Sequence, residues 1–218
     1  MRKDLSEILF TTHPSLYKSR DTTLMHFGFS CGDGWFELIN TLSALITKRT
    51  HHVIASQVKE KFGQLRFYFK NHEEHDSDYI YGLTIMAEIL SSLICDKCSL
   101  AGDLYFKGYV CTRCKKHKPA DAVFTKESVN LPFDTRNIGT MWKKCIDATL
   151  QFILINSNGI GCPNLIITGI KKDHQEQMLL EFTGGNEITK GMIEMLLAYS
   201  NKIDHETGDL KNDYKKST

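Results

Sequence analysis

The chain contains an internal repeat, and this repeat limits the possible folds more than any single motif. Trp35 precedes a run with apolar side chains at helical spacing, and Trp142 precedes a run in the same register. Asp33 and Thr140 stand just before the two tryptophans and are residue types that cap helices. We predict two amphipathic helices that each bury a tryptophan in the first turn. The matched positions are Leu38, Ile39, Leu42 and Ile46 in the first run and Cys145, Ile146, Thr149 and Ile153 in the second.

Each predicted helix is followed by two β-rich runs and then by another helix. HHVIASQV and GQLRFYF flank the polar turn KEKF, while NLIITGI and QMLLEF flank KKDHQE. Such pairs of runs are typical of antiparallel hairpins. Apolar residues at helical spacing over 79–94 and 188–203 predict the closing helices. The unit α-β-β-α therefore occurs twice.

Alternate residues of the second strand in each unit are apolar in both copies, which predicts a strand face buried against a helix. A two-stranded hairpin is marginal alone, so we expect the four strands to lie side by side with the helices on one face. The predicted core residues are Leu65, Phe67 and Phe69 in the first copy and Met178, Leu180 and Phe182 in the second.

Two Cys-x-x-Cys pairs lie between the copies, in CDKCSLAGDLYFKGYVCTRC at residues 95–114. The chain has 7 cysteines, an odd number, and cytoplasmic thiols stay reduced, so metal binding is favoured over disulfides. Two such pairs on neighbouring turns supply the closed tetrahedron of structural zinc. We predict a zinc ribbon with Cys95, Cys98, Cys111 and Cys114 as ligands. His117 is an alternative to Cys114 as the fourth ligand.

The predicted fold class is α+β, with duplicated α-β-β-α units, hairpins packed on helices and a zinc ribbon inserted after the first unit. Residues 1–94 would form the first unit with an N-terminal arm, and 95–117 the ribbon. Residues 118–134 read as an extended linker with two prolines. Residues 135–208 would form the second, degenerate unit. The polar segment 209–218 reads as a flexible tail.

The formal charge of +1 gives no global case for nucleic acid, so any such case is local. Tyr105, Phe106 and Tyr109 stand among cations of the ribbon, a mixture suited to stacked bases and phosphates. The alternative is that these aromatic residues pack over the metal. The candidate contacts for nucleic acid or a protein partner are Lys97, Lys107, Arg113, Lys115, Lys116, Lys118, Lys59, Lys61 and Arg66.

Other functions have weaker sequence support. His72 and Glu73 upstream of Cys95 resemble part of a zinc-deaminase signature, but Ile94 replaces its proline and a second Cys pair would fill the position of the catalytic water. No nucleophile elbow or phosphate-binding loop occurs, so we predict a protein that is not an enzyme. No run is long and apolar enough for a membrane span, and Asp4 and Glu7 interrupt any signal-peptide core. We expect a cytoplasmic protein.

Several motifs in order resemble an uncharacterised family of small proteins common in tailed-phage and prophage genomes. They are GDGWFELI at 32–39, VKEKFGQLRFYF at 58–69, AEILSS at 87–92 and the following Cys-x-x-Cys, within roughly the first 117 residues. In that family the last metal ligand is often a histidine. Here Cys114 occupies that position, and Ser99 stands where a glycine commonly follows the first pair. The resemblance implies phage origin and a zinc ribbon, and it brings no established activity.

These observations lead to two functional hypotheses. The first is a non-enzymatic phage protein that inhibits or modulates a host macromolecule, for example a defence nuclease or its nucleic-acid complex. The second is a zinc-ribbon nucleic-acid-binding protein.

Overall fold

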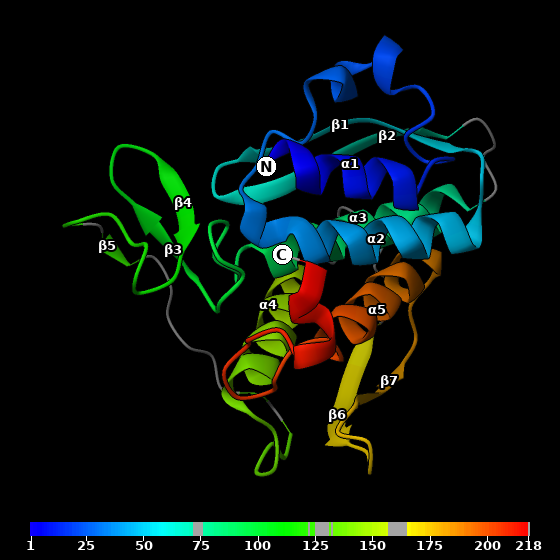
Figure 1. The fold of residues 1–218 in the computed structure, drawn as a ribbon. Helices are drawn as coiled ribbons and strands as arrows, with labels where there is room; N and C mark the ends of the chain where they lie inside the picture. The colour runs from blue at the N-terminus through cyan, green and yellow to red at the C-terminus, as the bar shows by residue number, and fades with distance from the viewer. Residues whose placement is uncertain (72–75, 122, 125–130, 132, 157–164, 218) are drawn as a thin grey trace.

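The computed structural model describes residues 1–71, 76–121, 123–124, 131, 133–156 and 165–217. In this part of the chain the fold is α+β, with five α-helices and antiparallel hairpins (Figure 1). The helices are α1 (Lys3–Thr12), α2 (Phe36–Arg49), α3 (Ser77–Ser91), α4 (Thr140–Asn156) and α5 (Glu187–Ser200). The strands are β1 (Val53–Lys61), β2 (Gln64–Asn71), β3 (Asp103–Phe106), β4 (Val110–Arg113), β5 (Val123–Phe124), β6 (Ile166–Lys172) and β7 (Met178–Thr183).

The order α-β-β-α occurs twice, as α2-β1-β2-α3 and as α4-β6-β7-α5. Both hairpins are antiparallel, and each contains a register shift in its first strand, between Ala55 and Gln57 in β1 and between Ile167 and Gly169 in β6. The hairpins belong to separate sheets, so the expectation of four strands side by side is wrong. Helices, not strands, join the two halves.

Helices α3 and α5 cross at a pair of glycines. A Cβ atom on Gly82 would lie 1.9 Å from the carbonyl oxygen of Ile188, and one on Gly191 would lie 2.1 Å from that of Tyr79. Ile188 follows Tyr79 by the same number of residues as Gly191 follows Gly82, so the contact is reciprocal. Backbones can approach this closely only where both helices lack a side chain. This crossing takes the place of the strand pairing that we expected between the halves.

Both tryptophans are fully buried, as predicted. The indole Nε1 of Trp35 donates to Ile94 O (2.9 Å), and that of Trp142 donates to Ser200 O (3.0 Å). Asp33 is not a helix cap: it lies in a 3₁₀ turn before α2, and its Oδ1 accepts a hydrogen bond from Arg2 N at 2.7 Å.

The strand faces follow the predicted alternation only in part. Leu65 and Met178 are buried, and Phe67, Phe69 and Leu180 are partly buried against the core. Phe182 is 39% exposed, so its assignment to the core is wrong. It lies near the end of a two-stranded sheet, where no third strand flanks β7 in the described chain.

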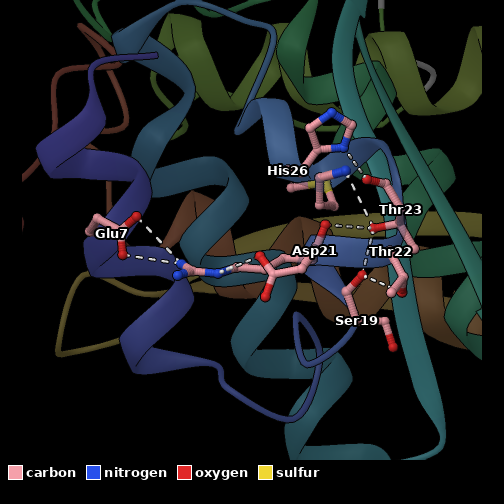
Figure 2. Close-up of polar contacts among 8 residues, drawn as sticks. Glu7, Ser19, Asp21, Thr22, Thr23 and His26 are labelled. Atoms are coloured by element: carbon pink, nitrogen blue, oxygen red, sulfur yellow. Dashed lines mark hydrogen bonds and ion pairs between the residues drawn. The ribbon is translucent and has the colours of Figure 1, made fainter.

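The N-terminal arm, residues 1–31, covers the first unit beside α2 and β1 (Figure 1). Polar contacts fix its turns, as Figure 2 shows: Thr23 Oγ1 donates to Ser19 O (3.0 Å), and Arg20 bonds Glu7 of α1 (3.1 Å). The arm then adds main-chain hydrogen bonds to the outer edge of β1 through Leu16 and Ser30.

The structure describes the predicted extended linker and the predicted flexible tail to different extents. In the predicted linker 118–134, residues 122, 125–130 and 132 lie outside the described residues, and Val123–Phe124 form the short strand β5, which pairs with β3. The predicted tail does pack on the domain at Leu210, which is buried, forms a bridge with Ile203, and is followed by the 3₁₀ turn Asn212–Ser217. The segment is polar overall, but the apolar side chain of Leu210 packs in the core.

Candidate metal centre

Four potential metal ligands converge where α3 leads into the β3–β4 hairpin. Cys95 and Cys98 lie in the turn after α3, Cys114 directly follows β4, and His117 lies in the next turn. One ligand atom of each residue lies within 4.8 Å of all the others. Cys95 and Cys114 are buried, and the other two are partly exposed. The arrangement is a Cys3His cluster that could bind a metal ion such as zinc.

The measured spacings fit the edges of a zinc tetrahedron. The sulfurs of Cys98 and Cys114 are 3.6 Å apart, and His117 Nδ1 lies 3.4 Å from Cys114 Sγ and 3.6 Å from Cys95 Sγ. Zinc–sulfur bonds of about 2.3 Å and zinc–nitrogen bonds of about 2.0–2.1 Å imply edges of about 3.5–3.8 Å. Three thiolates and an imidazole are also a usual donor set for structural zinc. The residues present therefore fit this metal.

The cluster differs from the predicted ligand set in one residue. Cys111 is not a member, and His117 is present together with Cys114 instead of replacing it. Cys111 is held inside β4, where it pairs with Tyr105 of β3. Cys114 lies beyond the end of the strand, and the hydrogen bond from His117 N to Cys114 O (3.0 Å) closes a turn that returns the imidazole to the sulfurs. The spacing Cys114-x-x-His117, equal to that of Cys95-x-x-Cys98, is the sequence signal that could have identified the fourth ligand.

The thiols differ in their electrostatic surroundings. Burial raises the pKa of Cys98 to about 12, with hydrogen bonds from neighbouring thiols acting in the same direction. For Cys114, burial acts to raise the pKa, but the backbone amides of His117 and Lys116 and the Cys98 thiol outweigh it and the pKa is lowered. Backbone N–H groups aimed at sulfur favour the thiolate, which is the form that binds metal.

The GDGW motif explains how the cluster is positioned. Gly34 N donates to Asp96 O at 2.8 Å, and a Cβ on Gly34 would lie 2.2 Å from Cys95 O. Gly32 packs equally closely, since its Cβ would lie 1.9 Å from Asp96 O. The two glycines therefore let the turn at the start of α2 pack directly against the backbone of Cys95 and Asp96. Only glycine permits this approach.

The KFG turn between β1 and β2 holds the other side of the ribbon. Thr112 Oγ1 donates to Gly63 O at 2.6 Å, and Asp96 N donates to Thr112 O at 3.3 Å. A Cβ on Gly63 would lie 2.7 Å from a methyl carbon of Leu104. The motifs on either side of the ribbon thus pack directly against it.

A loop of the second half, residues 202–211, has the same pattern of backbone hydrogen bonds as the loop 93–102 that carries Cys95 and Cys98, but it contains no cysteine. In the first loop the hydrogen bonds join Cys95 N to Leu100 O (2.8 Å), Ser99 N to Cys95 O (3.1 Å) and Gly102 N to Leu93 O (2.8 Å). In the second they join Asp204 N to Asp209 O (2.8 Å), Gly208 N to Asp204 O (2.9 Å) and Lys211 N to Lys202 O (2.9 Å). The hydrogen bond between the start of the helix and this loop also recurs. Met141 N donates to His205 O (2.9 Å), as Gly34 N donates to Asp96 O in the first half.

The Asp204 carboxylate occupies the position of Cys95 in this second loop. Its Oδ1 accepts hydrogen bonds from Glu206 N (3.0 Å), Thr207 N (2.8 Å) and Thr207 Oγ1 (3.1 Å). The amide of Thr207 is the largest cause that lowers the pKa of Asp204. A charged side chain therefore closes the turn by hydrogen bonding, where the first loop places a cysteine of the Cys3His cluster.

Replacement of Asp204 by alanine is expected to lower the free energy of unfolding by about 1–3 kcal/mol, because three bonds to one charged acceptor are lost. Urea titration would measure this change. Asp213→Ala, at an exposed site, is the control and should change stability by less than about 0.5 kcal/mol. In the wild type this contribution is complete above the unfolded pKa of about 3.9 and is lost as the pH falls through the lower folded pKa. An acid-stability profile that is identical in Asp204→Ala would contradict this role.

The basic residues proposed for partner binding do not form one surface set. The side chain of Arg113 is 13% exposed and pairs with Asp96, and Arg66 pairs with Glu88 at 2.6 Å. Lys107 Nζ donates to Ala120 O at 2.7 Å. Lys59 and Lys61 lie over aromatic rings, those of Tyr68 and Phe62. Four exposed lysines remain around the metal cluster: Lys97, Lys115, Lys116 and Lys118.

The aromatic residues of the ribbon divide into two groups. Tyr105 is buried, whereas Phe106 and Tyr109 are 52% and 58% exposed on either side of the β3–β4 turn. The expectation that all three pack over the metal therefore fails for these two.

His72 and Glu73 of the deaminase-like sequence lie outside the described residues, as does Cys162. Comparison of the chain with protein-family models, curated proteins and solved structures found no match. Among the described helices, none has the length and apolar character required to cross a membrane.

Proposed function

We propose that this chain is a phage-encoded protein that acts by binding a host macromolecule and has no catalytic turnover. The Cys3His cluster carries the proposal. Four protein ligands complete a tetrahedron, which leaves no coordination position for the water that a catalytic zinc requires. Zinc bound by Cys95, Cys98, Cys114 and His117 would serve as a structural brace. The phage origin rests on the sequence motifs alone.

The architecture of the two halves supports a binding role. The repeated α-β-β-α order, the reciprocal glycine crossing and the matched loop hydrogen bonds are accounted for by an internal duplication in which the second copy lost its metal ligands. In this proposal residues 1–94 and 135–208 are the two units, and 95–117 is the ribbon. The metal would then stabilise one copy, while hydrogen bonds that the Asp204 carboxylate accepts stabilise the other.

Stoichiometry tests this function. The tagged chain would be isolated with its partner from bacterial cells, and the partner's activity would then be titrated with purified protein. We expect the effect on the partner's activity to reach its maximum at molar equivalence, because binding without turnover requires one folded molecule for each target. The effect should be lost in a zinc-free Cys98→Ser variant. Full effect at a small fraction of equivalence would show turnover and overturn the proposal.

Nucleic-acid binding is the second candidate, favoured by the exposed Phe106 and Tyr109 on the same ribbon as the exposed lysines. Bases stacked on such rings contribute about 1–3 kcal/mol each, and lysines contact phosphates. Fluorescence anisotropy of single-stranded DNA should then show binding that weakens as salt rises from about 50 to about 200 mM.

Charge reversal at Lys115, Lys116 and Lys118 should weaken this binding more than tenfold, because three phosphate contacts would be lost. Lys3, Lys18 and Lys48, which are exposed elsewhere on the chain, provide a matched triple reversal with little expected effect. Equal loss in both triple variants would indicate non-specific attraction, and no binding at low salt would eliminate this candidate.

A further inference from the structure

The two hairpins differ in what lies along the outer edge of their first strand. In the first half, β1 pairs with β2 on one side and with the N-terminal arm on the other. Ser30 N donates to Val58 O (3.0 Å), and Glu60 N donates to Ser30 O (2.9 Å), so that Ser30 bridges β1 in parallel orientation. The arm completes the hydrogen bonding of this edge.

In the second half, no strand of the described part of the chain lies beside the corresponding edge of β6. Lys172 of β6 corresponds to Glu60 of β1. Glu60 pairs with Leu65, whose amide donates to Ser91 Oγ at the end of α3. Lys172 pairs with Met178, whose amide likewise donates to Asn201 Oδ1 at the end of α5. Asp173 N donates across the hairpin to Gln177 O, so the preceding amide, that of Lys172, points away from β7. Among the described residues, β6 pairs with β7 alone.

A groove of about 670 Å³ lies along this edge. The groove is lined by Asp134, Arg136, Asn137 and Ile138 from the segment before α4 and by Ile170, Lys171 and Lys172 from β6. Asn137 precedes Trp142 by as many residues as Ser30 precedes Trp35. The segment that bonds to the strand edge in the first half therefore stands apart from it in the second and leaves room for another chain.

We propose that an extended segment of a partner protein binds in this groove and adds to β6 as a parallel strand. Its main chain would accept from Lys172 N and donate to Ile170 O, as Ser30 does with Glu60 and Val58 in β1. The buried Ile138 and Ile170 provide apolar contacts for a side chain of the segment. The inference identifies the binding surface of the proposed function and rests on it.

The charges of the groove favour recognition through the main chain. Arg136 pairs with Asp134 (2.7 Å), Lys172 pairs with Glu176 (2.9 Å), and Lys171 pairs with Glu181. Each cation is thus already balanced, so a strongly acidic or basic partner gains little. Lysines on a strand edge also disfavour pairing between two copies of this chain, which leaves a different protein as the occupant.

A proline substitution tests the proposal on the full zinc-loaded chain. Lys172→Pro removes the outward amide hydrogen together with the lysine side chain, and proline is tolerated on strand edges. Lys172→Ala removes the same side chain but keeps the amide hydrogen, so it is the matched control. The probe is a displayed library of random extended peptides of about six residues, the usual strand length. We expect selected peptides to bind Lys172→Pro about tenfold or more weakly than the wild type and Lys172→Ala nearly as tightly.

Amide hydrogen exchange supplies the second readout. In the free chain Lys172 should exchange much faster than Glu60, and a selected peptide should slow Lys172. Equal protection of both amides in the free chain would show that the edge is already closed and would overturn the proposal, as would peptides that bind both variants alike. If an isolated partner binds Lys172→Pro at full affinity, strand addition is wrong while the binding function stands. If no partner binds but peptides show the expected pattern, only the wider function fails.

Discussion

Replacement of His117 by alanine is expected to abolish stoichiometric zinc binding, whereas replacement of Cys111 by serine should leave one zinc ion bound per chain. The reason is geometric: His117 Nδ1 lies within 3.6 Å of two cluster sulfurs, while Cys111 is outside the cluster. Cys95→Ser and Cys114→Ser should behave like His117→Ala. Metal content after dialysis, measured by mass spectrometry of the native protein, distinguishes these variants directly.

Loss of the metal should unfold the ribbon and leave the second half ordered. Structural zinc contributes about 10–16 kcal/mol of apparent binding free energy in small zinc domains, so the local effect is large. The second loop, by contrast, is closed by Asp204, whose hydrogen bonds need no ion. Hydrogen exchange of Cys95→Ser should therefore show fast exchange at Asp96, whose amide donates to Thr112 O, and near-wild-type protection within α5. Retained zinc in His117→Ala together with loss in Cys111→Ser would show that the ligand set is the one expected from the two Cys-x-x-Cys pairs.

Replacement of Gly82 by leucine is expected to lower the free energy of unfolding by about 3 kcal/mol or more and to destabilise both halves together. Even a Cβ atom at this position would lie 1.9 Å from Ile188 O, so α3 and α5 must separate. Overpacking of a core costs about 1–3 kcal/mol and occasionally more. Here the clashing atom belongs to the backbone, which cannot relieve the clash by changing a side-chain rotamer. Urea unfolding followed by circular dichroism would measure the loss.

The reciprocal contact gives this prediction a second test. Gly82→Ala and Gly191→Ala each force the same two helices apart, so the double variant should lose less stability than the sum of the single variants. Lys190→Ala, at an exposed position next to Gly191, is the control and should change stability by less than about 0.5 kcal/mol. Additive losses in the double variant would show that the glycines act at separate contacts.

Local patterns in the chain were sufficient to predict the elements. Alternating and helical periodicities predicted β1, β2, β6, β7 and the four helices around them, because a residue's preference for a strand or helix face depends on its near neighbours. The two buried tryptophans were predicted on the same basis. Three of the four clustered ligands follow from Cys-x-x-Cys spacing alone, since a tight turn is enough to bring two thiols together.

What local patterns could not predict depends on contacts between distant segments. Gly82 and Gly191 are unremarkable in sequence, yet their close approach decides that helices join the halves and that the hairpins stay in separate sheets. The choice of His117 over Cys111 depends on where β4 ends and how the next turn folds back. The burial of Leu210 and the pairing of Arg113 with Asp96 likewise depend on packing between remote parts of the chain.

The amino-acid sequence by itself thus determined the main helices and strands of the two units, their repeated order and the presence of paired cysteines that could bind a metal, because each of these follows from short-range spacing. Only the tertiary structure decided which histidine joins the three clustered cysteines, the way the halves join and which strand edge is left unpaired among the described residues. Those features follow from the close approach of backbone groups far apart in the chain, which no local spacing encodes.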